Sequence, residues 1–438
     1  MCAVGPISHS SSLASAVSTH PARAEAGGMS WWLARAQIRG AMACYIGLLR
    51  LGRVLGARRR PVPPGGAEIL MTGTFHSDNW VRSHIQPLAA SSECARLRIV
   101  ATNPVPNVPK VEAIYPPSWL RRSIGAVPAR LLTFIWVAVT TRPHVVGSFH
   151  LLINGLVTAL VGRWIGARSM YFCVGGPVEL LDGGVWGENK YFAKLRTPDA
   201  LVERWLLEAV AASDVVITMG TRAVRFFRQR GIETTYHVVA GGIDAATFTP
   251  ATAPPEFDTI LVARLVPIKT IDIYIRAVAE VARTRPGVRA LIVGDGPLRQ
   301  DLESLAKTLG VSANVTFAGQ QTNVEDWLRR SRVFVLTSES EGLALSMMEA
   351  MTAGLPAVVS RVGDLGDLVD DGHTGYLVGE RTPEAFAAKL ALLLDDPQRY
   401  REFSAAAKAA AARYERGETT RLWNRVLAQL DRGSVTAS

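Results

Sequence analysis

Short apolar runs alternate with amphipathic stretches along most of the chain beyond residue 66. This alternation is typical of strands buried on both faces with helices packed against them, so it predicts parallel sheets. The strands expected in the first half are Ala67–Met71, Leu97–Ala101, His144–Gly147, Ser169–Cys173, Asp214–Thr218 and Tyr236–Val239. Those expected in the second half are Thr259–Val262, Ala290–Val293, Val315–Phe317, Val333–Leu336 and Ala357–Ser360. The Pro-rich linker Pro250–Pro255 separates the two series. The pattern therefore predicts two α/β domains in tandem, with a ligand crevice at the carboxyl ends of their strands.

The composition of each stretch divides the chain into five parts. Residues 1–28 are predicted to be a disordered tail, which makes Met29 an alternative start. The other parts are a basic amphipathic segment at 29–66, an N-terminal domain at 67–248, a C-terminal domain at 249–412 and a C-terminal helix at 413–438. That last helix could pack back on the N-terminal domain.

A row of arginines follows one side of the helix expected at 29–57. The arginines Arg35, Arg39, Arg50 and Arg53 fall within about 60° on a helical wheel. The residues opposite are Leu33, Cys44, Leu48, Leu51 and Leu55. One interpretation is a helix lying in a membrane interface, with the arginines toward the lipid head groups. The other is a helix packed on its own domain. The spacing alone leaves both open.

The charge distribution argues against nucleic acid as a partner. The chain has 438 residues and a net charge of +10, but residues 1–60 hold eight arginines and a single acid, Glu25. The rest is nearly neutral, whereas a domain that follows phosphate backbones spreads Lys and Arg over its folded surface. Four widely separated cysteines form no CxxC pair, which favours a reducing cytoplasm. The longest apolar run, Leu131–Thr140, is too short to span a bilayer. We therefore expect a cytoplasmic protein, with the inner leaflet as a second, peripheral location.

Two loops in the second half suit a phosphate-bearing ligand. Arg264 and Lys269 follow the strand Thr259–Val262, and two cations at this spacing match a diphosphate. Gly294 and Gly296 form a tight turn after the next strand, where the backbone can approach a ligand closely. A solvated surface pair and a structural turn are the alternative interpretations.

A third loop carries two acids. A helix is expected to begin near Gly342, which would place Glu341 beside its N-terminus and Glu349 about two turns along. Carboxylates placed in this way accept hydrogen bonds from vicinal hydroxyls, as on a sugar or a ribose. The alternative is a helix-start acid and an exposed helical acid.

In this order, these motifs are specific. Residues 259–378 resemble the C-terminal domain of the group 1 (family 4) retaining glycosyltransferases. The matching motifs are the E-x7-E pair, the A-R-L-x-P-x-K loop, the V-G-D-G-P turn and the run D-G-H-T-G-Y-L-V at 371–378. The resemblance continues less closely through residues 67–430. It implies the GT-B fold, an α/β architecture of two Rossmann-like domains facing each other across a cleft. Two departures stand out, namely Ile268-Lys269-Thr270 where the family has E-K-G, and a shifted histidine after the third expected strand.

The resemblance implies a role for each matching residue. Arg264 and Lys269 would hold the donor diphosphate, Glu341 the transferred sugar and Glu349 the ribose. Further donor-binding positions are Gly73, Thr74, Gly294, Gly296, Gly342 and Leu343. His150 is the candidate for the acceptor-side catalytic histidine, with His76 and Asp78 as rivals. No metal and no cofactor is expected, because the nucleotide-sugar is a co-substrate.

The implied function is transfer of a sugar, with retention, from a nucleotide-sugar to a hydroxyl of a glycan or lipid-linked acceptor, as in polysaccharide biosynthesis. The N-terminal domain would bind the acceptor and the C-terminal domain the donor. Two other hypotheses remain. One is a nucleotide-sugar epimerase of the same fold, and the other is a non-catalytic, membrane-attached protein that binds nucleotide-sugars.

Overall fold

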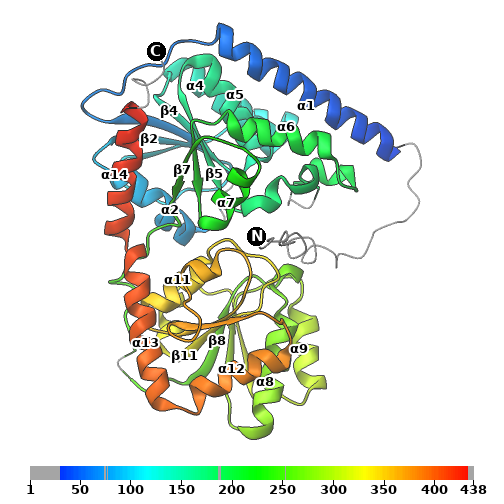
Figure 1. Cartoon of the computed structure of the whole chain (residues 1–438), viewed down its shortest axis with the longest axis vertical. Coiled ribbons are helices and arrows are strands. Elements are labelled where there is room, and N and C mark those ends of the chain that lie inside the picture. The colour runs from blue at the N-terminus through cyan, green and yellow to red at the C-terminus, as the bar shows by residue number, and fades with distance from the viewer. Residues whose placement is uncertain (1–29, 74, 76, 186–188, 252, 433–438) are drawn as a thin grey trace, which may run out of the picture.

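The chain folds into two parallel α/β domains, one above the other in Figure 1. The computed structural model describes residues 30–73, 75, 77–185, 189–251 and 253–432. The tail predicted at 1–28 lies outside these residues. All strand pairs within each sheet are parallel. The predicted α/β fold class is confirmed.

The N-terminal domain contains a seven-stranded sheet of order β3-β2-β1-β4-β5-β6-β7. Its strands are β1 (Ala67–Thr72), β2 (Cys94–Val100), β3 (Val111–Ile114), β4 (Val145–Phe149), β5 (Arg168–Cys173), β6 (Val215–Thr218) and β7 (Thr235–Val238). Its helices are α1 (Ser30–Leu55), α2 (Asp78–Ala90), α3 (Ser118–Ile124), α4 (Ala126–Thr141), α5 (Leu156–Ile165), α6 (Ala200–Ala211) and α7 (Thr221–Gln229). The strand order reverses direction between β1 and β4, and open sheets of this kind bind ligands beside that point.

The C-terminal domain contains a six-stranded sheet of order β10-β9-β8-β11-β12-β13. Its strands are β8 (Phe257–Val262), β9 (Ala290–Val293), β10 (Val315–Gly319), β11 (Ser331–Leu336), β12 (Ala357–Ser360) and β13 (Gly375–Val378). The helices that follow in the chain are α8 (Ile271–Thr284), α9 (Arg299–Thr308), α10 (Val324–Arg329), α11 (Leu345–Thr352), α12 (Pro383–Leu394), α13 (Pro397–Ala411) and α14 (Arg416–Arg432).

The last helix returns to the N-terminal domain. Figure 1 shows α14, in red, running from the lower domain up along the upper one. It packs on α2 and buries Trp423, Val426 and Leu427 in the core of that domain. The backbone N–H of Ser92 donates to the side chain of Asn424 at 3.1 Å. The chain therefore crosses between the domains twice, which fixes how their sheets face each other.

Helix α7 makes a second contact between the domains at its N-terminus. The N–H of Thr221 donates to the Asp367 carboxylate at 2.6 Å, and the N–H of Arg222 donates to Asp364 at 2.7 Å. Both carboxylates come from the C-terminal domain, and they satisfy N–H groups that have no partner within the helix. A Cβ at Gly220 would lie 2.2 Å from the Asp364 carboxyl carbon, so this close approach requires glycine.

Three arginines of the α1 row bind carboxylates of the protein, which favours the interpretation of a helix packed on its own domain. Arg35 and Arg39 each donate from Nε to the buried Asp199 carboxylate, at 2.8 and 2.9 Å. Arg50 pairs with Glu208 at 2.7 Å. The helix also buries Ile38, Met42, Ile46 and Leu49 against its own domain. Segment 29–66 is therefore part of the N-terminal domain, because Asp199 and Glu208, far away in sequence, pair with three arginines of the row.

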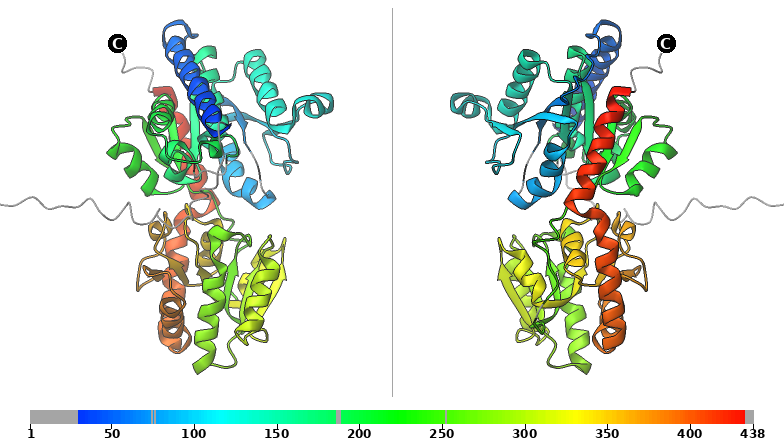
Figure 2. Two further views of the ribbon diagram at one scale, coloured as in Figure 1. Left: turned by 90° about the vertical axis from the view of Figure 1, so that its right-hand side faces the viewer. Right: turned by 90° about the vertical axis from the view of Figure 1, so that its left-hand side faces the viewer.

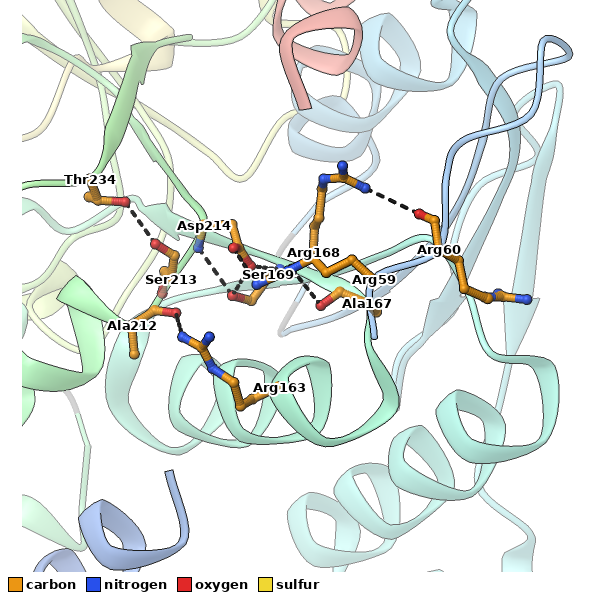
Figure 3. Close-up of polar contacts among 10 residues, drawn as sticks. All are labelled: Arg59, Arg60, Arg163, Ala167, Arg168, Ser169, Ala212, Ser213, Asp214 and Thr234. Carbon is orange, nitrogen blue, oxygen red and sulfur yellow. Dashed lines mark hydrogen bonds and ion pairs between the residues drawn. The ribbon is translucent and has the colours of Figure 1, made fainter. Parts of the chain in front are cut away.

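The chain after α1 is held at the amino ends of β5 and β6 (Figure 3). Arg59 donates to Asp214 at 2.5 Å and to the carbonyl of Ala167 at 3.0 Å. Asp214 also accepts from the backbone N–H of Ser169 at 2.7 Å. Within the described residues, α1 and the other helices are each too short or too polar to cross a bilayer.

Asp199 should stabilise the docking of α1 in a pH-dependent way. Burial alone would raise the pKa of Asp199, but hydrogen bonds from Arg39 and from the N–H of Val202, and the charge of Arg35, hold it below its usual value. The contribution is therefore present at neutral pH and is lost as the pH falls below about 4. We expect Asp199→Asn to lower the stability at pH 7 by about 1–2 kcal/mol, because two partly exposed arginines lose their partner.

Thermal unfolding of the wild type and of Asp199→Asn at several pH values tests this expectation. The two proteins should converge at acidic pH, where the wild-type carboxyl is also neutral. A difference that is constant at all pH values would contradict the ion-pair explanation.

Candidate functional site

Two loops at the carboxyl ends of β8 and β11 bring the predicted charged residues together. The Lys269 ammonium lies 2.5 Å from the Glu341 carboxylate, and both side chains are largely buried. The hydroxyl of Ser338 donates to the same carboxylate oxygen at 2.6 Å. Arg264 lies on the first of these loops and is exposed. The result is a cationic edge with one carboxylate fixed beside it.

The turn after Lys269 keeps a shape that glycine would adopt more easily. Thr270 stands where the resembling family has glycine, and its φ of 40° lies in the left-handed region. That conformation costs a non-glycine residue roughly 1 kcal/mol. The Thr270 hydroxyl donates to the carbonyl of Thr337 at 2.5 Å, while the Thr337 hydroxyl donates back to the carbonyls of Lys269 and Thr270. These bonds stabilise the turn at Thr270, where the sequence differs from the E-K-G of the resembling family.

Gly294 and Gly296 pack against the Arg264 loop. A Cβ at Gly294 would lie 1.9 Å from the carbonyl oxygen of Ala263, and one at Gly296 would lie 2.4 Å from that of Leu265. The N–H of Leu265 donates to the carbonyl of Asp295 at 2.9 Å. The two glycines are therefore required by the fit between the loops, and this fit positions Arg264.

Helix α11 begins at Leu345, later than the start expected near Gly342. Glu341 therefore lies in the preceding loop, and Lys269 and Ser338 hold its carboxylate in place of a helix N-terminus. A Cβ at Gly342 would lie 3.0 Å from the carbonyl of Val174, which belongs to the N-terminal domain. Leu343 is buried. The Gly342–Leu343 backbone thus lies where the two domains meet.

Glu349 is buried in α11, so the alternative of an exposed helical acid is wrong. The Asn79 side chain, from α2 of the N-terminal domain, donates a hydrogen bond to its carboxylate. Burial raises the pKa of Glu349 to about 7, although the bond from Asn79 acts in the opposite direction. Glu349 is therefore a carboxyl group that titrates near neutral pH between the two domains.

On the N-terminal side, Gly73 follows β1 and packs against Phe149, where a Cβ would lie 3.2 Å from that ring. Thr74 and His76 lie outside the described residues. Asp78 is exposed and is the first residue of α2. The structure therefore places Gly73 at the carboxyl edge of the sheet, opposite the C-terminal loops.

Arg130, a residue that the sequence analysis missed, organises this edge. Its buried guanidinium donates to the Thr72 hydroxyl at 2.6 Å and to the Asn154 side chain at 2.9 Å. Burial lowers the pKa of Arg130 to about 10. Both partners are neutral, so the guanidinium ties the end of β1 to the loop after β4. No local sequence signal marks it, because it lies within an apolar helical run.

His150 directly follows β4 and has a φ of 64°. Such a conformation is rare for a residue with a side chain and is often found at functional sites. Its Nδ1 lies 3.1 Å from the Glu179 carboxylate, and its side chain is 39% exposed. His150 is thus a partly exposed histidine with a defined orientation.

Glu179 is the second residue that the sequence analysis missed. Its carboxylate also accepts from the N–H of Leu151, the N–H of Gly175 and the hydroxyl of Tyr171, at 2.7–2.9 Å. Burial alone would raise the pKa of Glu179, but the charge and hydrogen bond of His150, together with the backbone N–H groups, hold it below its usual value. A stable carboxylate therefore orients the His150 ring.

Comparison with known proteins identifies the second domain. Residues 246–410 match the family described as "Glycosyl transferases group 1". The match covers less than half of the whole chain but nearly all of the C-terminal domain, including Arg264, Lys269, Glu341 and Glu349.

Curated relatives match part of the chain. A D-inositol 3-phosphate glycosyltransferase from Segniliparus rotundus is 34% identical over 193 residues, which cover 40% of this chain and 43% of the relative. The enzyme of the same name from Rhodococcus erythropolis is 33% identical over 228 residues, which cover 47% and 52%. The chain therefore matches about half the length of these relatives.

Solved structures match across both domains. HepE from Anabaena, in complex with UDP and glucose, has a TM-score of 0.65 and 17% identity, covering 83% of this chain and all of that one. Sucrose-phosphate synthase from Thermosynechococcus elongatus has a TM-score of 0.68 and 17% identity, covering 84% of this chain and all of that one. These likenesses confirm the GT-B fold that the resemblance implied.

The raised pKa of Glu349 predicts a pH-dependent effect of Glu349→Gln. The neutral carboxyl is favoured in the folded state, so ionisation costs the wild type stability as the pH rises from 4.5 to about 7. Glutamine cannot ionise and still accepts the hydrogen bond from Asn79. We expect Glu349→Gln to match the wild type below pH 4.5 and to be more stable above pH 7.

Unfolding temperatures of both proteins from pH 4 to 8 measure the difference. Glu380→Gln, at an exposed position after β13, is the matched control and should show no such trend. A variant that is less stable than the wild type at pH 8 would contradict the assignment.

Proposed function

We propose that this protein is a retaining glycosyltransferase that moves a sugar from a nucleotide-diphosphate sugar to an acceptor hydroxyl. The observation that carries the proposal is the Lys269–Glu341 pair beside Arg264, inside a domain of the group 1 family and at the edge facing the N-terminal domain. Two cations suit the diphosphate, and a fixed carboxylate suits the hydroxyls of the transferred sugar.

In this proposal, the C-terminal loops stabilise the departing nucleotide. Negative charge grows on the diphosphate as the bond to the sugar breaks, and fixed cations at that place lower the barrier. Lys269 is held by Glu341, and Arg264 is positioned by the packing of its loop against Gly294 and Gly296. Neither needs to reorganise during the reaction. Glu349 would accept hydrogen bonds from the ribose, with Asn79 as its partner before the nucleotide binds.

His150 is the proposed acceptor-side residue. Glu179 fixes its ring, and its partly exposed side chain lies at the carboxyl end of β4. A histidine oriented by a carboxylate can accept a proton from a hydroxyl or hold that hydroxyl in place. The assignment favours His150 over Asp78, which is exposed at the start of α2.

The comparisons support particular substrates. The name of the curated relatives points to a hydroxyl of a phosphorylated polyol as one acceptor class, and UDP and glucose in HepE support a UDP-sugar donor. A glycan or a lipid-linked acceptor, a role in polysaccharide biosynthesis and a cytoplasmic location stay predictions. Measuring donor hydrolysis and transfer across UDP-, GDP- and ADP-sugars tests the proposal. Release of a free epimer without acceptor would point to an epimerase.

Removal of the Lys269 charge should slow transfer strongly. We expect Lys269→Ala to lower kcat on the order of 10²-fold, the usual scale for a lost donor to a developing charge. Lys307→Ala removes an exposed lysine from α9 and should keep wild-type activity. Steady-state kinetics with the best donor of the panel gives both values. Equal kcat for the two variants would rule out this role.

We also predict that transfer needs no divalent cation, since Arg264 and Lys269 supply positive charge at the diphosphate. Activity should stay within about twofold after treatment with EDTA, whereas loss of a cation that stabilises the transition state costs several kcal/mol. Loss of activity in EDTA that Mg²⁺ or Mn²⁺ restores would contradict this prediction.

A further inference from the structure

One face of the N-terminal sheet is covered by an outer layer of helices. Leu70 of β1 pairs with Val146 of β4, which pairs with Ser169 of β5, so these three side chains share a face. Helix α4 packs Phe134 and Val137 on Leu70 and Val146. Tyr171, two residues after Ser169, points to the same face and belongs to the cluster in which α1 buries Ile38. Helices α4 and α1 therefore lie over the same face, and α5 contacts both (Figure 2).

The outward side of this layer is unusually apolar. Helix α4 contains one charged residue, Arg130, and that residue is buried. We define the α3–α4 face as Trp119, Ile124, Val127, Leu132, Trp136 and Val139. Their exposed fractions run from 42% to 65%, with both tryptophans above 60%. Exposed apolar patches of this kind mark interaction surfaces.

The segment that forms the α3–α4 face carries charge of a single sign. Residues 113–143 contain four arginines and no acid. Arg121 and Arg122 are exposed on α3, and Arg142 is exposed directly after α4. Burial lowers the pKa of His144, and the nearby charges of Arg60 and Arg168 act in the same direction, whereas Glu68 acts in the opposite one. His144 follows α4 closely in the chain, so this end of the face lies near Arg60 and Arg168, which are drawn in Figure 3.

We propose that the α3–α4 face docks on the surface of an anionic phospholipid bilayer. Its tryptophans and aliphatic side chains would enter the interface, and its arginines would contact the head groups. A second copy of this chain fits less well. In a twofold dimer the same patch meets itself, so arginines without acids would face one another.

Helix α1 adds a second exposed apolar row to this surface. The ion pairs of its arginines hold the opposite side of the helix against the protein, so this row points outward. Leu48, Leu51, Val54 and Leu55 are exposed along its last turns, and none of its residues is acidic. Helix α1 lies on the other side of α5 from α4, over the same sheet face. The leucine side of α1 thus faces the bilayer, while its arginines bind Asp199 and Glu208.

The docked face reaches the edge of the cleft. Arg130, in the second turn of α4, bonds to Thr72 at the carboxyl end of β1, just before Gly73. Helix α3 and the first turn of α4 therefore lie at the cleft end of the sheet. Provided that the proposed function holds, an acceptor carried on a lipid would enter from the bilayer at this edge.

Sedimentation of the full chain with vesicles tests the proposal. The wild type should bind vesicles of phosphatidylglycerol and phosphatidylcholine, and bind vesicles of phosphatidylcholine alone more weakly. Trp119→Ser combined with Trp136→Ser should lower the affinity about 100-fold, since each ring contributes about tenfold. Leu392→Ser, at an exposed leucine of the C-terminal domain, is the matched control and should bind like the wild type.

A charge variant separates head-group contact from apolar insertion. Arg121→Gln combined with Arg122→Gln should lower binding to the anionic vesicles about tenfold or more at low salt and leave binding to the neutral vesicles unchanged. Unfolding temperatures close to the wild-type value would show that all these variants fold. Wild-type binding by the double tryptophan variant would overturn the proposal. So would a dimer in gel filtration that Trp136→Ser dissociates, with no binding to vesicles.

Donor hydrolysis in solution keeps this proposal distinct from the proposed function. The tryptophan variants should hydrolyse the nucleotide-sugar at the wild-type rate, because the α3–α4 face includes neither the loop of Lys269 nor the loop of Glu341. Vesicle binding without any donor turnover would leave the docking proposal intact and remove the glycosyltransferase. Donor turnover without vesicle binding would leave the proposed function intact and remove the docking proposal.

Discussion

The geometry of the cleft depends on the contact between α7 and the two carboxylates of the C-terminal domain. Asp364 and Asp367 accept hydrogen bonds from the first N–H groups of α7, and Gly220 allows the backbone to come this close. Together with α14, this contact holds the carboxyl ends of both sheets toward each other. Gly342 then approaches Val174, and Glu349 meets Asn79. The contacts of Gly342 and Glu349 are therefore a property of the domain arrangement, since neither domain alone brings these groups together.

The sequence predicted the C-terminal half of the site well for a physical reason. In a parallel sheet every loop after a strand emerges at the same edge, so motifs that follow successive strands come together without further information. Lys269 follows β8 and Glu341 follows β11, and these strands are neighbours in the sheet. Their meeting at 2.5 Å follows from topology. The glycines of the 294–296 turn could be located by sequence as well, although their reason is the fit between two loops.

Other features could not be predicted because the deciding partner is distant in sequence. The helical wheel of α1 gave two opposite faces, and only Asp199 and Glu208, more than 150 positions away, decide which one is buried. Arg130 reads as an interruption of an apolar helix until Thr72 and Asn154 lie beside it. Glu179 likewise lies 29 residues from His150. Polar groups that organise a site across several loops leave no periodic signal along the chain.

Partners that are distant in sequence also change how the net positive charge of the chain is interpreted. Arginines that pair with buried carboxylates contribute to the fold, and they are no longer available to an external anion. What distinguishes Arg121, Arg122 and Arg142 is that the segment from 113 to 143 carries no acid at all. A positive charge beside an exposed apolar face has few favourable neighbours except an anionic interface that is itself partly apolar. The relevant quantity is thus the arrangement of charge around the helices, because the net charge of +10 counts paired and unpaired arginines alike.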